Sequence, residues 1–489
     1  MQYQDEVLCS RSGDDRALDG PLSMSRRCVT ANVTMDTKII AFLPSTSFTC
    51  CSDCSAVGAV EWFQKKSPVS RCAALLRILG AATMAMVVGC SGEDAPVVPA
   101  VEEGAAARLG EQLFSEVNLS FNRTQSCATC HDPEAAFVDA RREEGLLLPA
   151  SLGDDGESLG GRNAPTAAYA FLSPAFTRGT RMRHNTDGDI SSYEGYLGGL
   201  FYDGRAADLE EQASGPPLNP IEMGLPDAEA VVERVRENRD YESQLTALFG
   251  ADIWQDPDRA FAAVAQSIAA FERSETFAPF DSRYDRSLLR PSDDARYVFH
   301  PASAAAQGRA LFFSKEFTNC AACHQLNAQG SQGAREEPFT GFEYHNLGVP
   351  ENRPLIERSG SEMDLGLGGS LEQSQEDGKF KTPTLRNVAL TGPYMHNGVF
   401  GELSTVIRFY EHAKQRERGQ EDDSTNPETG EPWAPAEVPR NISTEELANG
   451  NQDLADDDLV FAMECFLISL TDARYEPLLD ADRVQRCGL

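Results

Sequence analysis

The sequences CATCH at residues 127–131 and CAACH at residues 320–324 share one pattern, in which two cysteines enclose two residues and a histidine follows. The cysteine and histidine frequencies of the chain predict about 0.005 chance matches, so two copies are significant. The pattern is that of c-type haem attachment, with two thiols for thioether bonds and a histidine that ligates iron from one face. The sequence therefore predicts two covalently bound c-type haems, called haem 1 and haem 2 below.

Each haem is expected to be held by two thioether bonds and one axial histidine. The thioether positions are Cys127, Cys130, Cys320 and Cys323, and the iron ligands are His131 for haem 1 and His324 for haem 2. Zinc knuckles or redox dithiols are the alternative, but zinc needs further ligands at short spacing. No other cysteine lies between Cys130 and Cys320, and none follows Cys323 until Cys465. Haem is therefore the favoured interpretation.

The chain has 489 residues, enough for two or three domains with separate cores. Its formal net charge of −33 argues against nucleic acid or an anionic membrane as a partner. An acidic, solvated surface accounts for this charge without a partner.

Residues 69–90 read VSRCAALLRILGAATMAMVVGC, a basic start and an apolar run that ends in small residues and a cysteine. The run is short and is interrupted by Arg77, so it suits a lipoprotein signal peptide at residues 69–89 better than a membrane span. We expect Cys90 to carry a lipid anchor on the periplasmic side, as the sole membrane attachment, followed by a linker over residues 90–103.

Residues 1–68 precede this signal, although a signal peptide should begin a chain. They contain five cysteines without the order of metal ligands. We expect either that the true translation start lies near Val69 or that residues 1–68 form a disordered leader.

A Gly-x-x-Leu-Phe pattern precedes both haem motifs, at residues 110–114 and 308–312, and indicates an internal repeat of a cytochrome c module. Apolar residues at helical spacing occur at residues 227–249 and 257–275. We predict a mainly α fold with long loops and little β structure. The predicted domains are residues 104–295 with haem 1 and residues 296–475 with haem 2, followed by a tail at 476–489.

The last helix is predicted at residues 456–470. Cys465 lies within it and Cys487 beyond it. An oxidising compartment permits a disulfide between them, and two free thiols are the alternative.

The residues that follow the first haem motif lack a strong sixth ligand for the iron. Between His131 and Asn163 there is neither histidine nor methionine. An open iron suits reaction with peroxide, whereas a six-coordinate iron suits electron transfer. Haem 1 is therefore expected to be accessible to hydrogen peroxide.

Six further motifs occur in order along the chain. They are GRNAPT at residues 161–166, FYDGRA at 201–206, NPIEM at 219–223, FEYHNLG at 342–348, TPTLRN at 382–387 and TGPYMHNG at 391–398. With the haem motifs, they make the chain resemble the bacterial dihaem cytochrome c peroxidase and MauG superfamily over about residues 104–475. Peroxidases of that superfamily that need reductive activation have a histidine after the first haem motif, so this chain resembles the MauG and MbnH branch.

The resemblance implies roles for residues near haem 1. Glu222 matches the distal-pocket glutamate, and a carboxylate there can move a proton between the two oxygens of peroxide. Gln212 and Pro216 match further pocket positions. Tyr202 stands where the family commonly has tryptophan between the haems, and either relays an electron hole or only packs.

Two residues compete for the sixth position of haem 2. Met395 is the choice by comparison with ordinary cytochromes, whereas the family's axial position, fourteen residues after His396, falls on Tyr410. We favour Tyr410. The alternative is that Tyr410 only packs in the core as a half-buried tyrosine. A phenolate stabilises oxidised iron, whereas a thioether raises the reduction potential.

The family also binds calcium between its domains, and the matching positions are Asn163, Thr391 and Pro393. An amide oxygen and two backbone carbonyls suit this hard cation. His345 and His396 are expected to contact ligands or propionates rather than iron. His184 is expected in a solvated loop.

The resemblance implies that peroxide removes two electrons and that both irons share the oxidation in a bis-ferryl-like state. The expected function is oxidation of an aromatic side chain, tryptophan being expected, of a partner protein. One alternative is a peroxidase that draws electrons from a small cytochrome c. The other is a non-enzymatic electron-transfer cytochrome, which the missing sixth ligand of haem 1 disfavours.

Overall fold

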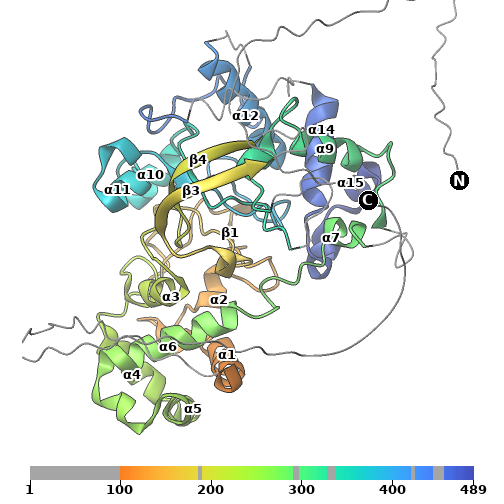
Figure 1. Ribbon diagram of the computed structural model, residues 1–489. Coiled ribbons are helices and arrows are strands. Elements are labelled where there is room, and N and C mark those ends of the chain that lie inside the picture. Colours follow the sequence, from red (N-terminus) through yellow and green to blue (C-terminus); the bar gives the residue numbers. More distant parts are fainter. Residues whose placement is uncertain (1–99, 185–189, 290–296, 328–335, 420–423, 444–455) are drawn as a thin grey trace, which may run out of the picture. The chain divides into compact units, whose positions relative to one another are not determined.

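The computed structural model describes residues 100–489 except 185–189, 290–296, 328–335, 420–423 and 444–455 (Figure 1). The described residues all lie in one structural unit, Ser91–Leu489. The expected leader, signal peptide and Cys90 anchor lie outside the described residues, as does the predicted domain boundary near residue 295. The predicted linker is described from residue 100 only, where a helix already begins.

Helices dominate, as predicted. In the first half they are α1 (Ala100–Phe114), α2 (Cys127–Cys130), α3 (Leu209–Leu218), α4 (Ala228–Arg236), α5 (Arg239–Phe249) and α6 (Pro257–Glu272), with the 3-10 helices η1 (Val117–Leu119), η2 (Ala170–Leu172) and η3 (Ala251–Gln255). In the second half they are α7 (Arg283–Ser287), α9 (Ala304–Phe313), α10 (Arg353–Ser359), α11 (Leu367–Leu371), α12 (Leu403–Glu417), α14 (Asp457–Ile468) and α15 (Ala481–Cys487), with η5 (Cys320–Ala322), η7 (Ser374–Glu376) and η8 (Ala473–Leu478). None of these helices has the length and apolar character needed to cross a bilayer.

Most strands are only two residues long. They are β1 (Arg142–Glu143) paired with β2 (Leu146–Leu147), and β5 (Tyr344–His345) paired with β6 (Phe380–Lys381). The exception is an antiparallel hairpin of β3 (Thr177–His184) and β4 (Ile190–Leu197), visible as the two long arrows in Figure 1. His184 is therefore the last residue of a strand, and the expectation of a loop was wrong.

Side-chain caps explain where several helices begin. The predicted helical region at residues 227–249 is two helices, because the Asn238 side chain accepts from the Asp240 amide and starts α5. Asp256 caps α6 in the same way and is followed by Pro257, whose fixed φ suits a first helical position. Asp456 caps α14. These caps satisfy amides that the first turn of a helix leaves without partners.

The internal repeat is a pair of crossed helices, α1 with α6 and α9 with α14. A Cβ on Gly110 would lie 1.8 Å from the Ser267 carbonyl oxygen, and a Cβ on Gly308 would lie 1.9 Å from the Ala462 carbonyl oxygen. Glycine is therefore required at both crossings, because any side chain would separate the backbones. The glycine of each Gly-x-x-Leu-Phe pattern serves this contact.

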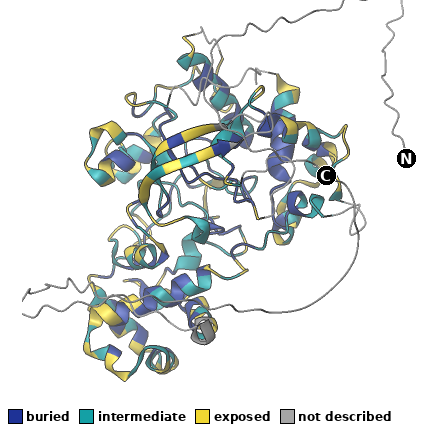
Figure 2. Ribbon diagram, viewed as in Figure 1, coloured by how far each residue is buried: buried dark blue, intermediate teal, exposed yellow. Residues whose placement is uncertain are grey.

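Each helix pair supports its own apolar core, and Figure 2 shows buried residues along α6 and α14. The first core includes Leu109, Leu245 and Val264. The second includes Phe312 and Phe466, whose ring centroids lie 5.0 Å apart. Two similar cores in one chain are what an internal repeat predicts.

Buried polar contacts join the two halves. The Tyr169 hydroxyl donates to Asp472 at 2.6 Å, and the Asn387 side-chain amide donates to the other oxygen of that carboxylate at 2.8 Å. The tail folds back as α15, where Cys487 forms a disulfide with Cys465 of α14. Of the two alternatives that the sequence left open, the disulfide is therefore the one present.

Replacing Gly308 by alanine tests the helix crossing. The new Cβ would overlap the Ala462 carbonyl, so we expect a loss of about 1–3 kcal/mol or more in the free energy of unfolding. The readout is the thermal midpoint of the haem-loaded protein. Gly369→Ala is the control, because its Cβ would meet the nearest atom, Leu365 Cβ, at an ordinary 3.5 Å. Equal midpoints for the two variants would contradict the steric argument.

Candidate haem centres

Both haem motifs hold their histidines in the same way. The Nδ1 atom of His131 lies 3.2 Å from the Phe137 carbonyl oxygen, and Nδ1 of His324 lies 3.2 Å from the Phe339 carbonyl oxygen. Because a carbonyl only accepts hydrogen bonds, each Nδ1 carries the proton. The lone pair on each Nε2 is therefore available to a metal.

Burial keeps both rings neutral, as a metal ligand must be. It lowers the pKa of His324 to about 4, although the Phe339 carbonyl opposes this shift. Burial lowers the pKa of His131 in the same sense. A threonine hydrogen bond is also repeated next to each of these carbonyls. The Thr166 hydroxyl donates to the carbonyl of Ala136, which precedes Phe137, and the Thr384 hydroxyl donates to that of Pro338, which precedes Phe339, both at 2.6 Å.

The second motif opens onto a cavity of about 340 Å³, with a mostly apolar lining. Cys320, Cys323 and His324 line this cavity, and neither cysteine forms a disulfide. Two unpaired thiols and a neutral imidazole at an apolar cavity of this size fit a c-type haem. Cys127 and Cys130 are likewise unpaired beside His131, so the first motif has the same donor set.

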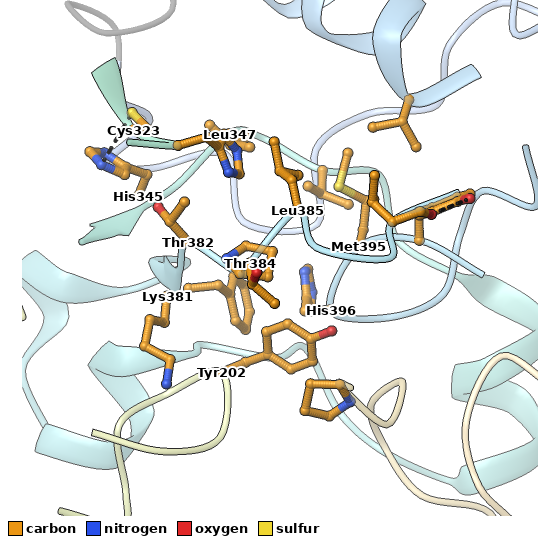
Figure 3. A pocket seen from close by; sticks show the side chains of 18 of the residues that line it. Tyr202, Cys323, His345, Leu347, Lys381, Thr382, Thr384, Leu385, Met395 and His396 are labelled. Atoms are coloured by element: carbon orange, nitrogen blue, oxygen red, sulfur yellow. Dashed lines mark hydrogen bonds between the residues drawn. The ribbon is translucent and has the colours of Figure 1, made fainter. Parts of the chain in front are cut away.

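Both candidates for the sixth position of haem 2 line this cavity. Tyr410 lies on α12 and is one of the residues that line the cavity. Burial raises its pKa, and the thiols of Cys323 and Cys320 add to the shift, which indicates that the hydroxyl lies near both. Met395 approaches from the loop before α12 (Figure 3). The geometry brings both candidates to the cavity and does not separate them.

Glu222 is half-buried after the end of α3. Burial raises its pKa, and Arg205 and Asn219 oppose this shift. Its charge raises the pKa of both Cys127 and Cys130, which indicates that the carboxyl lies near the first haem motif. The structure therefore brings Glu222, predicted as a pocket residue, close to the first haem motif.

The turn after α3 fixes the position of Glu222. The Pro216 carbonyl accepts from the amides of Asn219 and Met223, each at 3.2 Å. Gln212 lies one turn earlier on α3 and is half-buried. The three predicted pocket residues are therefore neighbours on α3 and its following turn.

Tyr202 lines the haem-2 cavity although it belongs to the first half (Figure 3). Its carbonyl accepts from the Lys381 amide at 2.7 Å. Burial raises the pKa of the Tyr202 phenol, and Arg162 opposes the shift. Burial also lowers the pKa of the Lys381 amine to about 7, opposed by Asp203. Tyr202 thus lies where the two halves meet.

The predicted calcium residues come together at the same junction. The side-chain nitrogen of Asn163 lies 2.5 Å from the Pro393 carbonyl oxygen. The backbone N–H of Asn163 donates to the His396 carbonyl at 2.8 Å. Asn163, Thr391 and Pro393 all line the cavity. Rotation of the Asn163 side-chain amide would place its oxygen beside the Pro393 carbonyl oxygen. Two neighbouring oxygens of this kind favour a bound cation. The donor chemistry fits calcium.

His345 and His396 each contact a carboxylate through Nε2. In the two motif histidines, by contrast, Nδ1 contacts a carbonyl and Nε2 is left for a metal. His345 Nε2 lies 2.9 Å from Glu343, and His396 Nε2 lies 3.1 Å from Glu437. His396 also stacks on Phe380 with ring centroids 3.6 Å apart. These contacts suit structural roles beside the cavity.

Sequence reasoning missed the ion cluster around Glu343. Arg181 and Arg183 of β3 bind its two oxygens at 2.5 and 2.6 Å. Burial alone would raise the pKa of Glu343, but His345 and the two arginines outweigh it and lower that pKa to about 2. The alternation Arg-Met-Arg at residues 181–183 was the available signal, because alternate residues of a strand point to one face.

The comparisons with known proteins agree with this site. A family model for di-haem cytochrome c peroxidase matches residues 104–293. Methylamine utilization protein MauG of Paracoccus denitrificans is 44% identical over 414 residues, which cover 84% of this chain and 99% of that protein. Cytochrome c peroxidase Ccp of Escherichia coli is 27% identical over 300 residues, 61% of this chain and 51% of that protein.

A solved structure of the diheme peroxidase BthA from Burkholderia thailandensis matches with a TM-score of 0.59 and 30% identity, over 77% of this chain and 88% of that one. The chain belongs to the dihaem cytochrome c peroxidase and MauG family. It is therefore a haem peroxidase-type oxidoreductase, and membership implies two c-type haems.

Replacing Glu343 by glutamine tests the ion cluster that joins the halves. The change leaves the guanidinium groups of the buried Arg183 and the largely buried Arg181 without their carboxylate. We therefore expect a loss of about 3–5 kcal/mol in the free energy of unfolding at neutral pH. Because the folded-state pKa is lowered, the native advantage is complete above about pH 4.5 and disappears as pH falls toward about 2. Denaturant midpoints across this range measure both effects.

Glu351→Gln is the matched control, because Glu351 pairs with the exposed Arg353. Such surface pairs contribute at most about 1 kcal/mol. A native advantage that persists unchanged at the acidic end would contradict the charge-based account of Glu343.

Proposed function

We propose that this protein uses hydrogen peroxide to oxidise an aromatic side chain, tryptophan, of a partner protein. The observation that carries the proposal is the inequality of the two haem centres. An acidic side chain, Glu222, lies near the first pair of thiols, whereas a phenol, Tyr410, lies near the second. The 44% identity to methylamine utilization protein MauG over nearly the whole of that protein supports the choice within the family.

Glu222 would act at the first centre as the proton-transfer group. Reduction of one hydrogen peroxide to two waters consumes two electrons and two protons, and the electrons come from the partner's side chain. Cleavage of the oxygen-oxygen bond needs a proton moved to the leaving oxygen, and a half-buried carboxyl with a raised pKa suits that transfer. The bound haem would supply the redox-active iron, and Gln212 and Pro216 would shape the pocket around peroxide.

Tyr410 would ligate the iron at the second centre. A phenolate is a hard anionic donor that stabilises oxidised metal, and binding to a cation would lower the pKa that burial raises. The position of the phenol at the cavity, near both thiols of the second motif, supports the assignment. Met395 is the alternative ligand and would favour the reduced state instead.

The junction between the halves would hold the two centres at a fixed separation. Calcium bound by Asn163, Thr391 and Pro393 would add a link between two cytochrome c-like domains, at residues 104–295 and 296–475. Tyr202 would lie between the haems and relay an electron hole, with loss of its phenolic proton. We further propose a periplasmic location with a lipid anchor at Cys90.

The central test is reaction of the ferric, haem-loaded protein with one equivalent of peroxide. We expect electron paramagnetic resonance to detect one high-spin and one low-spin haem at rest. We expect peroxide to produce a near-infrared absorption band without prior reduction. Two low-spin haems and no reaction would refute the proposal. Activity that requires prior reduction and a small cytochrome c would support an ordinary dihaem peroxidase instead.

A Tyr410→Phe variant tests the axial ligand separately. The low-spin signal of haem 2 should change or disappear, because phenylalanine cannot ligate iron. Met395→Leu is the control and should leave that signal unchanged. The opposite pattern would assign the position to Met395 and leave the rest of the proposal standing.

A Glu222→Gln variant tests proton transfer at haem 1. Loss of a general acid-base group lowers a rate by about 10²–10⁴-fold, so peroxide should be consumed that much more slowly in stopped-flow measurements. Glu211→Gln on the exposed side of α3 is the control and should retain the native rate. A native rate in Glu222→Gln would remove the residue from the mechanism.

A further inference from the structure

A second carboxyl group near haem 1 is not used by the proposed function. Glu272 is the last residue of α6, is 6% exposed, and has a side-chain oxygen, Oε2, that is buried without a hydrogen-bond partner. Burying a carboxyl group without compensation costs free energy, so an apolar residue would serve packing better. Its presence therefore calls for a functional explanation.

The internal repeat shows what Glu272 faces. The two glycine crossings align Ser267 of α6 with Ala462 of α14, because each provides the carbonyl that the glycine meets. They also align Phe271 with Phe466. The Phe271 Cβ lies 3.0 Å from the position of a Cβ on Gly110, and the Phe466 Cβ lies 2.9 Å from that of a Cβ on Gly308. The residue after Phe466 is Leu467, which lines the haem-2 cavity. Glu272 is its equivalent on α6, so the side that faces haem in the second half carries a carboxyl in the first.

The charges near the two motifs agree with this alignment. Glu272 raises the pKa of Cys127, the first thiol of the first motif. Lys414 acts in the opposite sense on Cys320, the first thiol of the second motif. The same position in the two attachment sites therefore experiences a carboxyl in one half and an ammonium group in the other.

The surroundings of Glu272 favour its neutral form at neutral pH. Burial raises its pKa to about 8; Arg273 opposes the shift and Glu210 of α3 adds to it. Arg273 is already bound by Glu210 at 2.7 Å, which weakens its effect on Glu272. The negative end of the helix dipole lies at the C-terminus of α6 and also disfavours a negative charge on its last residue.

We propose that Glu272 lines the haem-1 pocket and takes up a proton when the iron of haem 1 is reduced. With haem 1 bound, its iron would accept one electron from a one-electron donor, such as a reduced small redox protein or the electrode in the test below. The ionised fraction of Glu272 would then fall, and each carboxylate that becomes a carboxylic acid would take one proton from solvent. No bond of the haem is formed or broken. A negative charge near the haem stabilises ferric iron, so reduction favours protonation and protonation favours reduction. The inference requires haem 1 alone and is independent of peroxide chemistry and of any partner.

Electrochemical titration of the haem-loaded protein at several pH values from about 6 to about 10 tests the proposal. We expect the midpoint potential of one haem to fall as pH rises through the ionisation of Glu272, and that pH dependence to be lost in Glu272→Gln. Glu272→Leu, which copies the residue of the second half, should also lose it and should give a less pH-sensitive haem 1. The other haem is the internal reference.

Glu275→Gln is the matched control, because Glu275 lies three residues beyond Glu272 and is exposed. It should keep the native pH dependence. A Glu272→Gln variant with the native pH dependence overturns the proposal, as does loss of that dependence in both Glu272→Gln and Glu275→Gln. Glutamine preserves the shape of the side chain, so we expect the Glu272→Gln variant to fold and to incorporate haem. The test then rests on this variant if Glu272→Leu does not fold.

Discussion

The structure depends on one repeated constraint, a histidine that must stay neutral and keep its orientation beside two thiols. A backbone carbonyl, that of Phe137 or Phe339, holds Nδ1 of each motif histidine at the same distance. Burial of both rings prevents protonation, which would remove the lone pair that iron needs. The helix crossings and the two cores support these short motifs, the second of which opens onto a mostly apolar cavity.

Given two equal attachment sites, function must arise from unequal surroundings. Carboxyl groups gather near the first motif, where Glu222 and Glu272 both act on Cys127. A phenol and an ammonium group act on the second, through Tyr410 and Lys414. The two thiol pairs therefore differ in the charges and donor groups around them, which gives one cofactor two different surroundings from a few side chains.

The sequence predicted the features that follow local patterns. Haem motifs, helical periodicity and the glycine before each motif all act over a few residues. The β3–β4 hairpin was missed because its strands are largely polar, and His184 was consequently assigned to a loop. Glu272 could not be distinguished from other acids, since its burial depends on how α6 crosses α1. Tyr410 and Met395 remain rival ligands because both reach one cavity.

The buried contacts between the halves have a consequence for the independence of the two repeats. Tyr169 in one half completes the hydrogen bonds of Asp472 in the other, and Glu343 neutralises two arginines that its own half does not contain. Neither half satisfies its polar interior alone. Division of the chain between the two halves would therefore leave buried polar groups of each piece without partners, and we expect neither piece to fold alone.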